Sequence, residues 1–249
     1  MNPTESRLAE QLAALKLLAL AQQYAPLATE AAQKQWSHVD YLARLIDSET
    51  QRRHQLALQR RILAARFPAL KSLDQFDWTW PKKINAAQKD DVGLILQECQ
   101  AKEVLDLGGV GLGKTHLATA LAYEACRRGH SVLFTTAVDI INTLTAAQTV
   151  GRLKAELKRY TKPAVLAVDE LGYLPIDKLG ADLLFQVISQ RYERGSIVLT
   201  TNQPYKHWAK IFNNDSTLTS AVLDRLLHHA ETVIIEGKSY RMKDQIETP

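Results

Sequence analysis

Residues 108–115 have the sequence Gly108-Gly109-Val110-Gly111-Leu112-Gly113-Lys114-Thr115. We call this segment the phosphate loop, because it fits the pattern G-x-x-x-x-G-K-[S/T], which binds phosphate groups between a strand and a helix. An apolar run, VLDL, precedes it at 104–107, and a helical pattern follows it at 116–128. The glycines let backbone amides turn toward phosphate oxygens, and the helix start adds the positive end of its dipole. The sequence therefore predicts a nucleotide site made of residues 108–115 and the adjoining His116.

Two side chains that end the phosphate loop, and two carboxylates farther along the chain, are expected to carry the chemistry. Lys114 would reach the terminal phosphates, and Thr115 would offer its hydroxyl to Mg2+. The apolar run at 164–168 ends in Asp169 and Glu170, at the strand end where open α/β sheets bind ligands. Asp169 would hold the magnesium ion, and Glu170 would orient or deprotonate a water that attacks the γ-phosphate. Such a pair is often only a surface pair, but a phosphate loop upstream favours the catalytic interpretation.

From residue 103 onward, short apolar runs alternate with helical patterns. The runs lie at 104–107, 131–136, 164–169, 196–201 and 232–236, and the helical patterns at 116–128, 138–145 with 151–160, 180–194 and 217–229. Strands this apolar are typical of parallel sheets buried on both faces, and the alternation is typical of α/β folds. We predict a P-loop NTPase domain at 101–249, with five parallel strands flanked by helices. Periodicity does not give the order of the strands.

Residues 1–70 are predicted to form a small all-α domain. Leucines recur at helical spacing near the N-terminus, and Pro26 is expected to end this first helix. Ser37, with Asp40 three positions later, marks the start of a second helix. That helix should run to about residue 66, because Pro68 stops it.

Residues 71–100 are predicted to be a linker and a leading helix between the two domains. The segment SLDQFDWTWPKK at 72–83 combines acidic residues, aromatic residues and a proline. We expect this linker to be ordered, with its aromatic side chains docked on a neighbouring domain.

Composition excludes several classes of protein. Of the 249 residues, 46% are hydrophobic and 23% are charged, as in globular proteins and unlike disordered or fibrous chains. The apolar runs are shorter than the roughly 18 residues of a membrane span, and the N-terminus lacks a secretory signal pattern. Cys99 and Cys126 cannot form a disulfide framework, and we expect both thiols to be reduced and partly buried. We therefore expect a soluble cytoplasmic protein with no membrane partner.

Basic residues are concentrated in two places, although the net charge is only +4. The first cluster, between 51 and 72, contains no acidic residue, and the second, between 152 and 162, is interrupted only by Glu156. Such local density is typical of nucleic-acid contacts, but a solvated helix face explains a single cluster equally well. The residues predicted to contact DNA, mainly through its phosphates, are Arg52, Arg53, Arg60, Arg61, Arg66, Lys154, Lys158 and Arg159.

Three further polar residues are candidates for the reaction, each on weaker evidence. Asn202 follows the run at 196–201 and is placed to position the attacking water. Arg225 and Arg241 are alternative candidates for the arginine that stabilises charge during phosphoryl transfer. A strand-end asparagine is usually a turn residue, and most arginines are solvated. His228 and His229 are predicted to be a pair at a helix C-terminus and not ligands or bases.

Several segments of the chain resemble the IstB family. The resemblance is carried by GGVGLGKTHLA (108–118), VDELGYLPIDKLGADLLFQVISQRYERGSIVLTTN (168–202) and LDRLLHHA (223–230). These proteins are ATP-binding transposition helpers of bacterial insertion sequences and relatives of the DnaC-type helicase loaders in the AAA+ class. The segments LKLLALAQQY and DQFDW also resemble the family, so the likeness spans nearly the whole chain.

The resemblance implies a role for each candidate residue and a set of partners. It implies that Lys114 and Thr115 are the Walker A pair and that Asp169 and Glu170 are the Walker B pair. It also implies that Asn202 is the sensor asparagine, Arg225 the trans-acting arginine finger and Arg241 the second sensor arginine. An arginine acting in trans implies an ATP-dependent homo-oligomer, a ring or spiral on double-stranded DNA. The N-terminal helices would then contact DNA and the transposase of the same insertion sequence, in the bacterial cytoplasm. Only 13 residues follow Glu236, so the helical lid domain of many AAA+ proteins has no room, which agrees with the family.

The chain departs from the family at Asp106 and at Gly109-Val110, where two prolines are usual, so we expect a more flexible loop and weaker nucleotide binding. The favoured hypothesis is a Mg-dependent, DNA-stimulated ATPase that assembles on DNA with ATP and regulates a transposase. A DnaC-type helicase loader would share the core and differ in its client. A small-molecule kinase would need an acceptor pocket and usually a lid, and a nucleotide-binding scaffold would not hydrolyse ATP at all.

Overall fold

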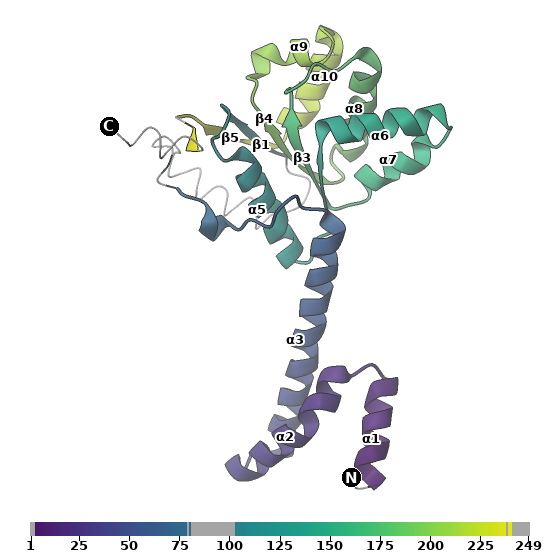
Figure 1. Cartoon of the computed structure of the whole chain (residues 1–249), viewed down its shortest axis with the longest axis vertical. Helices are drawn as coiled ribbons and strands as arrows, with labels where there is room; N and C mark the ends of the chain where they lie inside the picture. Colours follow the sequence, from purple (N-terminus) through teal and green to yellow (C-terminus); the bar gives the residue numbers. More distant parts are fainter. Residues whose placement is uncertain (1–2, 79, 81–102, 238, 241–249) are drawn as a thin grey trace. The chain divides into compact units, whose positions relative to one another are not determined.

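The computed structural model describes residues 3–78, 80, 103–237, 239 and 240 (Figure 1). Its contacts divide the chain into two units, Met1–Arg60 and Arg61–Pro249. None of the helices in the described ranges is long and apolar enough to span a membrane. Several predictions lie outside these ranges: the leading helix up to residue 100, Cys99, Arg241 and the absence of a lid after residue 240. The side chain of Asp106 is likewise not described.

The first unit is helical, but its first break differs from the prediction. Helix α1 spans Pro3–Ala14 and α2 spans Leu18–Lys34, so α2 runs through Pro26. The prediction that Pro26 ends the first helix is therefore wrong. Proline removes the hydrogen bond to the carbonyl four residues earlier, and here that residue, Gln22, is exposed to solvent. The actual break lies near Lys16, which has a φ of 58°.

A buried carboxylate compensates for the uncapped start of α2. Leu17, the N-cap residue, provides no side-chain hydrogen bond. Instead the Ala19 backbone N–H donates to Glu49 Oε2 at 2.8 Å, and Arg53 Nε donates to Glu49 Oε1 at 2.9 Å. The hydrogen bond from Arg53 contributes most, and together with the bond from Ala19 it holds the pKa of Glu49 below its usual value. Because free amides at a helix start need acceptors, Glu49 stabilises the junction between α2 and the helix that carries it, α3 (His38–Ala65).

The predicted boundaries of α3 are confirmed. Ser37 Oγ accepts the Asp40 backbone N–H at 3.1 Å and donates to the Asp40 carboxylate at 2.6 Å. At the other end the helix stops at Ala65, and Arg66 has a φ of 61°. The serine and the proline at 68 thus mark both ends of this long helix.

The second unit contains a five-stranded parallel sheet (Figure 1). Its strands are β1 (Glu103–Gly108), β2 (Val132–Thr136), β3 (Val165–Leu171), β4 (Ser196–Thr201) and β5 (Ala230–Ile235). Each predicted apolar run contributes to one of them. The spatial order is β2-β3-β4-β1-β5, and every pairing is parallel. Strand β4 therefore lies between the strand before the phosphate loop and the strand that ends near Asp169 and Glu170.

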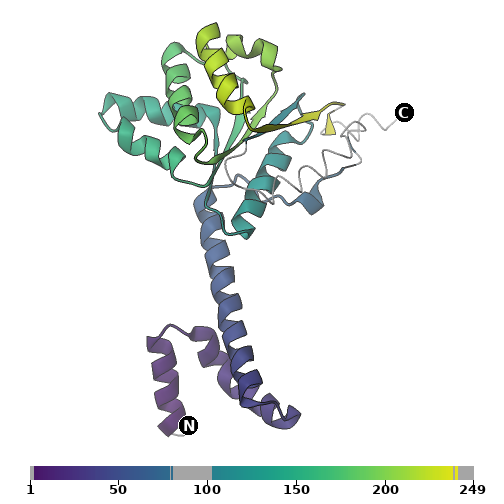
Figure 2. The ribbon, with the colours of Figure 1, turned by 180° about the vertical axis from the view of Figure 1, so that it is seen from behind.

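Helices cover both faces of this sheet (Figures 1 and 2). Helix α5 (Lys114–Arg127) packs along β1 to β4, and α6 (Ala137–Thr149) packs on β2 and β3. Helix α8 (Lys178–Arg191) contacts α6, α7 (Leu153–Thr161) and α10 (Ser216–Leu227). Three of these helices, α6, α8 and α10, have an N-cap side chain whose oxygen accepts the backbone N–H of the residue three positions later. The N-cap residues are Thr136, Asp177 and Asp215. Such caps explain why the predicted helix starts were close to the observed ones.

Two short elements between β4 and α10 were not predicted. They are the 3-10 helix η2 (Tyr205–His207) and the helix α9 (Trp208–Ile211). A helix this short shows no periodic pattern, and burial of Trp208, which has no exposed area, holds it in place. Within α5, burial raises the pKa of the Cys126 thiol to about 11, so this thiol is inert at neutral pH.

Candidate functional site

The phosphate loop connects β1 to α5 through two glycines with left-handed backbone conformations. Gly111 has a φ of 78° and Gly113, the N-cap of α5, has a φ of 91°. Residues with a Cβ seldom adopt such angles. The first turn of α5 thus begins directly at the loop, and the free amides of a helix start are a ready-made anion site.

Two distant segments press on these glycines. A Cβ at Gly113 would lie 2.8 Å from the ring of Phe76, and a Cβ at Gly111 would collide with Ser239 Oγ. Tyr240 also donates its backbone N–H to the Gly111 carbonyl at 2.9 Å. The prediction that the aromatic linker docks on its neighbour is thus confirmed for Phe76, which is 7% exposed. Both glycines are required by close packing as well as by their φ angles.

His116 holds the aromatic linker in this position. Its Nε2 lies 3.1 Å from the Ser72 carbonyl oxygen, and its ring packs edge-on against Phe76 with 5.3 Å between centroids. Ser72 precedes the 3-10 helix η1 (Leu73–Gln75) and completes a capping box with Gln75. His116 therefore supports the wall of the site, a contact that the motif alone does not predict.

Lys114 lies within the phosphate loop. Its side chain is 5% exposed, and Nζ donates to the Gly109 carbonyl at 2.7 Å. The ammonium group is therefore already directed into the loop whose amides would surround a phosphate.

A buried carboxylate joins the phosphate loop to β4. The hydroxyl of Thr115 lies 3.1 Å from Asp169 Oδ1, and Thr200 donates its own hydroxyl to the same oxygen. Thr200 Oγ1 also accepts the Glu170 backbone N–H at 3.0 Å. This contact is possible because β4 lies between β1 and β3. Thr200 was not predicted as a site residue, because its signal in the sequence is merely a hydroxyl residue near the end of an apolar run.

Glu170 occupies an irregular position in β3. The pairing of β3 with β4 shifts between Val168 and Leu171, and Glu170 has a φ of 63°. Bulges of this kind redirect a side chain, and a strained backbone at a strand end is characteristic of functional sites. As a result Asp169 is buried while its neighbour Glu170 is exposed.

A cavity of about 640 Å³ collects most of these residues. Its lining includes Val110 to His116, Glu170, Tyr173 and Tyr240. Gly108 and Gly109 lie at the end of β1 and just after it, outside the lining. The linker also contributes to the lining, through residues that include Phe76 and Trp80. The volume suits a nucleotide-sized ligand.

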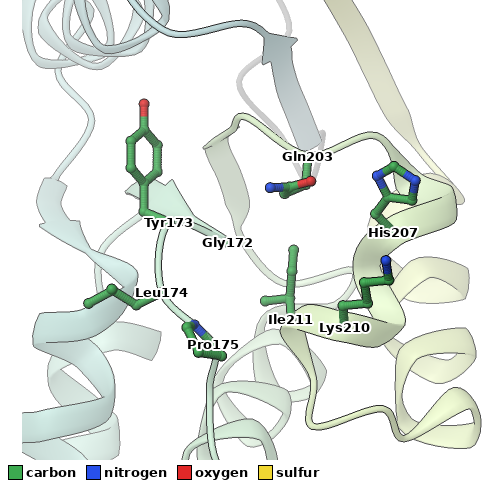
Figure 3. Close-up of a pocket in the computed structure, with 8 residues that line it drawn as sticks. All are labelled: Gly172, Tyr173, Leu174, Pro175, Gln203, His207, Lys210 and Ile211. Atoms are coloured by element: carbon green, nitrogen blue, oxygen red, sulfur yellow. The ribbon is translucent and has the colours of Figure 1, made fainter.

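A second cavity, of about 320 Å³, lies beyond the ends of β3 and β4 (Figure 3). Leu174, Pro175 and Ile211 form its apolar part, whereas Gln203, His207 and Lys210 contribute polar groups on the other side. Tyr173 lines both cavities. The loop after Glu170 is thus shared between the two.

Asn202 and Arg225, two of the remaining candidates, lie outside the lining of the larger cavity. Asn202 follows β4, and its Oδ1 is buried without a hydrogen-bond partner in the described part of the chain. Arg225 donates to the Ala221 carbonyl at 2.8 Å and lies over the Phe185 ring, 4.9 Å from its centroid. Among the described residues, neither Asn202 nor Arg225 lines the larger cavity.

The predicted DNA-contacting residues differ in how they are engaged. Arg52 and Arg53 lie 3.7 Å and 2.9 Å from Glu49, although no acidic residue occurs between 51 and 72. Arg61 donates to the Cys126 carbonyl at 2.8 Å, and Arg159 pairs with Glu156 at 3.0 Å. The exposed members of the set are Arg53, Arg60, Arg66, Lys154, Lys158 and Arg159.

Comparison with known proteins gives a consistent result. A family model described as "IstB-like ATP binding protein" matches residues 10–248. The ATP-binding protein of insertion sequence IS21 from Pseudomonas aeruginosa is 38% identical over 94% of this chain and 88% of its own length. The corresponding protein of IS232 from Bacillus thuringiensis subsp. berliner is 38% identical over 98% of this chain and 97% of its own.

The fold is also found among solved structures. The crystal structure of the DnaC helicase loader matches with a TM-score of 0.53 and 22% identity, over 71% of this chain and 98% of that one. This likeness concerns the AAA+ type P-loop fold alone. The family-model match and the two relatives, which cover nearly the whole sequence, show that this chain belongs to the family of IstB-like ATP-binding proteins of insertion sequences.

Proposed function

We propose that this protein hydrolyses ATP to ADP and phosphate, and that it uses this reaction to help DNA transposition. The observation that carries the proposal is the junction of Thr115, Asp169 and Thr200 beside the loop that holds Lys114. In this arrangement the phosphate loop and the exposed carboxylate of Glu170 line one cavity, and the buried carboxylate of Asp169 contacts Thr115, which lines the same cavity. A family defined by ATP binding supplies the substrate.

The residues present fit a magnesium ion. Thr115 Oγ1 and Asp169 Oδ1 are 3.1 Å apart, and hydroxyl and carboxylate oxygens are ligands that Mg2+ prefers. When bound, Mg2+ would neutralise charge on the β- and γ-phosphates. Thr115 would hold it directly, and Asp169, which also accepts from Thr200, would fix its position.

Three further side chains have separate roles in ATP hydrolysis. Lys114 binds the terminal phosphates and leaves its contact with the Gly109 carbonyl to do so. Glu170 orients the attacking water and accepts its proton, because the bulge in β3 exposes its carboxylate at the cavity. The partnerless Oδ1 of Asn202 is a further group that a water could occupy.

The position of Arg225 supports the proposal that the protein assembles into an oligomer. Its guanidinium lies over Phe185 on α8, away from the cavity of its own subunit. We infer that Arg225 stabilises charge at the site of a neighbouring subunit, and that ATP promotes this contact. Arg241 would act as a second sensor arginine within its own subunit.

The DNA partner is supported by exposed basic residues in both units. We assign DNA and transposase binding mainly to residues 1–70, the connection to residues 71–100, and ATP hydrolysis to residues 101–249. Lys154 and Lys158, one helical turn apart on α7, would add phosphate contacts from the ATPase domain. The protein would then act in the bacterial cytoplasm, where ATP and DNA occur together.

The test is ATP hydrolysis by the full chain with and without duplex DNA, together with particle size measured by light scattering. Glu170→Gln should abolish hydrolysis but retain ATP-dependent assembly, whereas Lys114→Ala should abolish both. Lys154→Ala, as a comparison, should leave DNA-free hydrolysis intact and weaken DNA stimulation. A protein that stays monomeric with ATP, and whose hydrolysis is indifferent to DNA, would contradict the proposal. Stimulation by a replicative helicase, but not by the transposase, would favour a helicase loader.

A further inference from the structure

We propose that Glu193, His228 and His229 form a binding site for a divalent transition-metal ion of the zinc class. Each residue offers one ligand atom, and the three atoms lie within 4.8 Å of one another. His229 Nε2 is 3.7 Å from Glu193 Oε1. The cluster lies outside the proposed nucleotide site, and none of its members lines either described cavity.

The end of α10 brings the two imidazoles together. Helix α10 ends at Leu227, and His228, its C-cap, keeps a helical backbone conformation with φ −59° and ψ −40°. The His228 and His229 rings lie close together there, with 4.1 Å between their centroids. The predicted position of this pair at a helix C-terminus is confirmed. The sequence-based expectation that the two histidines are not ligands is the part that this proposal replaces.

His228 has the supporting contact that a metal ligand needs. Its Nδ1 lies 2.6 Å from the hydroxyl oxygen of Tyr192, and the two rings are stacked with 5.9 Å between centroids. A histidine that binds a metal through Nε2 donates its Nδ1–H to a nearby acceptor, which fixes the tautomer and the ring orientation. The Tyr192 oxygen is in position to accept this hydrogen bond and leaves Nε2 for the ion.

Glu193 is held toward the histidines by an unusual turn. Its φ is 57°, a conformation that is uncommon for a residue with a long side chain. The turn is anchored by Arg191, which is 1% exposed and donates to the carbonyls of Tyr160, Pro163, Ala164 and Ser196. Strain that the surrounding structure maintains in this way is a recognised feature of binding sites.

The donor set selects the class of ion. Two imidazoles and one carboxylate suit zinc, nickel or copper, whereas magnesium and calcium prefer sites made of oxygen alone. Bonds of about 2.0–2.2 Å to a tetrahedral zinc ion, with water as the fourth ligand, require these ligand atoms to move closer than their present separations of up to 4.8 Å. The three side chains are exposed, so rotation about their own bonds can bring this about. Bound there, the ion ties the turn after α8 to the carboxyl end of α10, the helix that carries Arg225.

The experiment is a titration of the untagged full chain with Zn2+ by calorimetry, and with Co2+ by visible absorption. The wild-type protein should bind one equivalent of Zn2+ per chain, and Co2+ should give the absorption bands of a low-coordinate nitrogen and oxygen site. His229→Ala and Glu193→Gln should each weaken binding by at least about 10-fold. Tyr192→Phe should keep the shape of the Co2+ spectrum but weaken binding by roughly 10-fold, because it removes only the supporting oxygen.

The matched control is His54→Ala, which removes an exposed histidine from α3 and should leave binding unchanged. Circular dichroism of each variant verifies that the fold is retained. No binding by the wild-type protein at about 0.1 mM Zn2+, a concentration far above the dissociation constants of structural zinc sites, would overturn the proposal. Binding that survives both His229→Ala and Glu193→Gln would also overturn it, because the ion would then lie elsewhere.

Discussion

Replacing Thr200 by valine tests whether this residue organises the two carboxylates. Valine has nearly the same shape but lacks the hydroxyl, which donates to Asp169 and accepts the Glu170 N–H at 3.0 Å. The side chain is 1% exposed, so water cannot replace it. Loss of a hydrogen bond to a charged group, together with an unsatisfied backbone N–H, should lower the free energy of unfolding by about 2–4 kcal/mol. Because the Glu170 bulge loses its anchor, kcat for ATP hydrolysis should fall by about 10-fold to 100-fold.

Urea unfolding and steady-state ATP hydrolysis measure the two effects separately. Thr200→Ser retains the hydroxyl and should recover most of both. Thr201→Val is the matched control, since Thr201 is a neighbour in β4 with no exposed area. Its hydroxyl accepts the Gln203 N–H at 3.1 Å. That variant should lose about 1 kcal/mol and keep its kcat.

Two results would refute this reasoning. If Thr200→Val hydrolyses ATP with the kcat of the wild-type protein, the hydroxyl does not position Glu170. If it loses no more stability than Thr201→Val, its bond to Asp169 contributes no more than an ordinary neutral hydrogen bond.

Two further predictions concern stability in each unit. Glu49→Gln should speed hydrogen exchange at the start of α2, where the Ala19 N–H is bonded to Glu49. Because the pKa of Glu49 is lowered in the folded state, the difference in exchange rate between variant and wild type should be full above the ordinary pKa of this carboxyl and vanish as the pH falls through its folded pKa. A difference in exchange rate that does not depend on pH would contradict this prediction. Gly195→Ala should lower the free energy of unfolding, measured in urea, by about 2–4 kcal/mol. The new Cβ would lie 2.7 Å from a nitrogen of the Arg191 guanidinium, which is held by four backbone carbonyls. A loss below about 0.5 kcal/mol, the range of ordinary surface changes, would show that Arg191 moves freely.

Sequence patterns predicted the parts of the fold that depend on near neighbours. The helix start at Ser37 needs only Asp40, three residues away, and the structure has both hydrogen bonds. The phosphate loop is likewise a contiguous segment, whose glycines adopt the positive φ angles that the pattern requires. Pro26 shows the limit of such rules. The hydrogen bond that this proline removes costs little free energy on an exposed helix face, where water can replace it, so the helix continues through it.

The motifs, the strand–helix alternation and the family were thus contained in the order of the residues, because each rests on chemistry within a few positions of the chain. The contacts that complete the site were not. Thr200 meets Asp169 across 31 positions of sequence, and Phe76, within the linker, packs against Gly113 in the phosphate loop. Both contacts depend on the spatial order of the strands and on the docking of the linker. Those are set by the packing of the whole domain, since a periodic pattern records which face of a strand is buried but not which strand lies beside it.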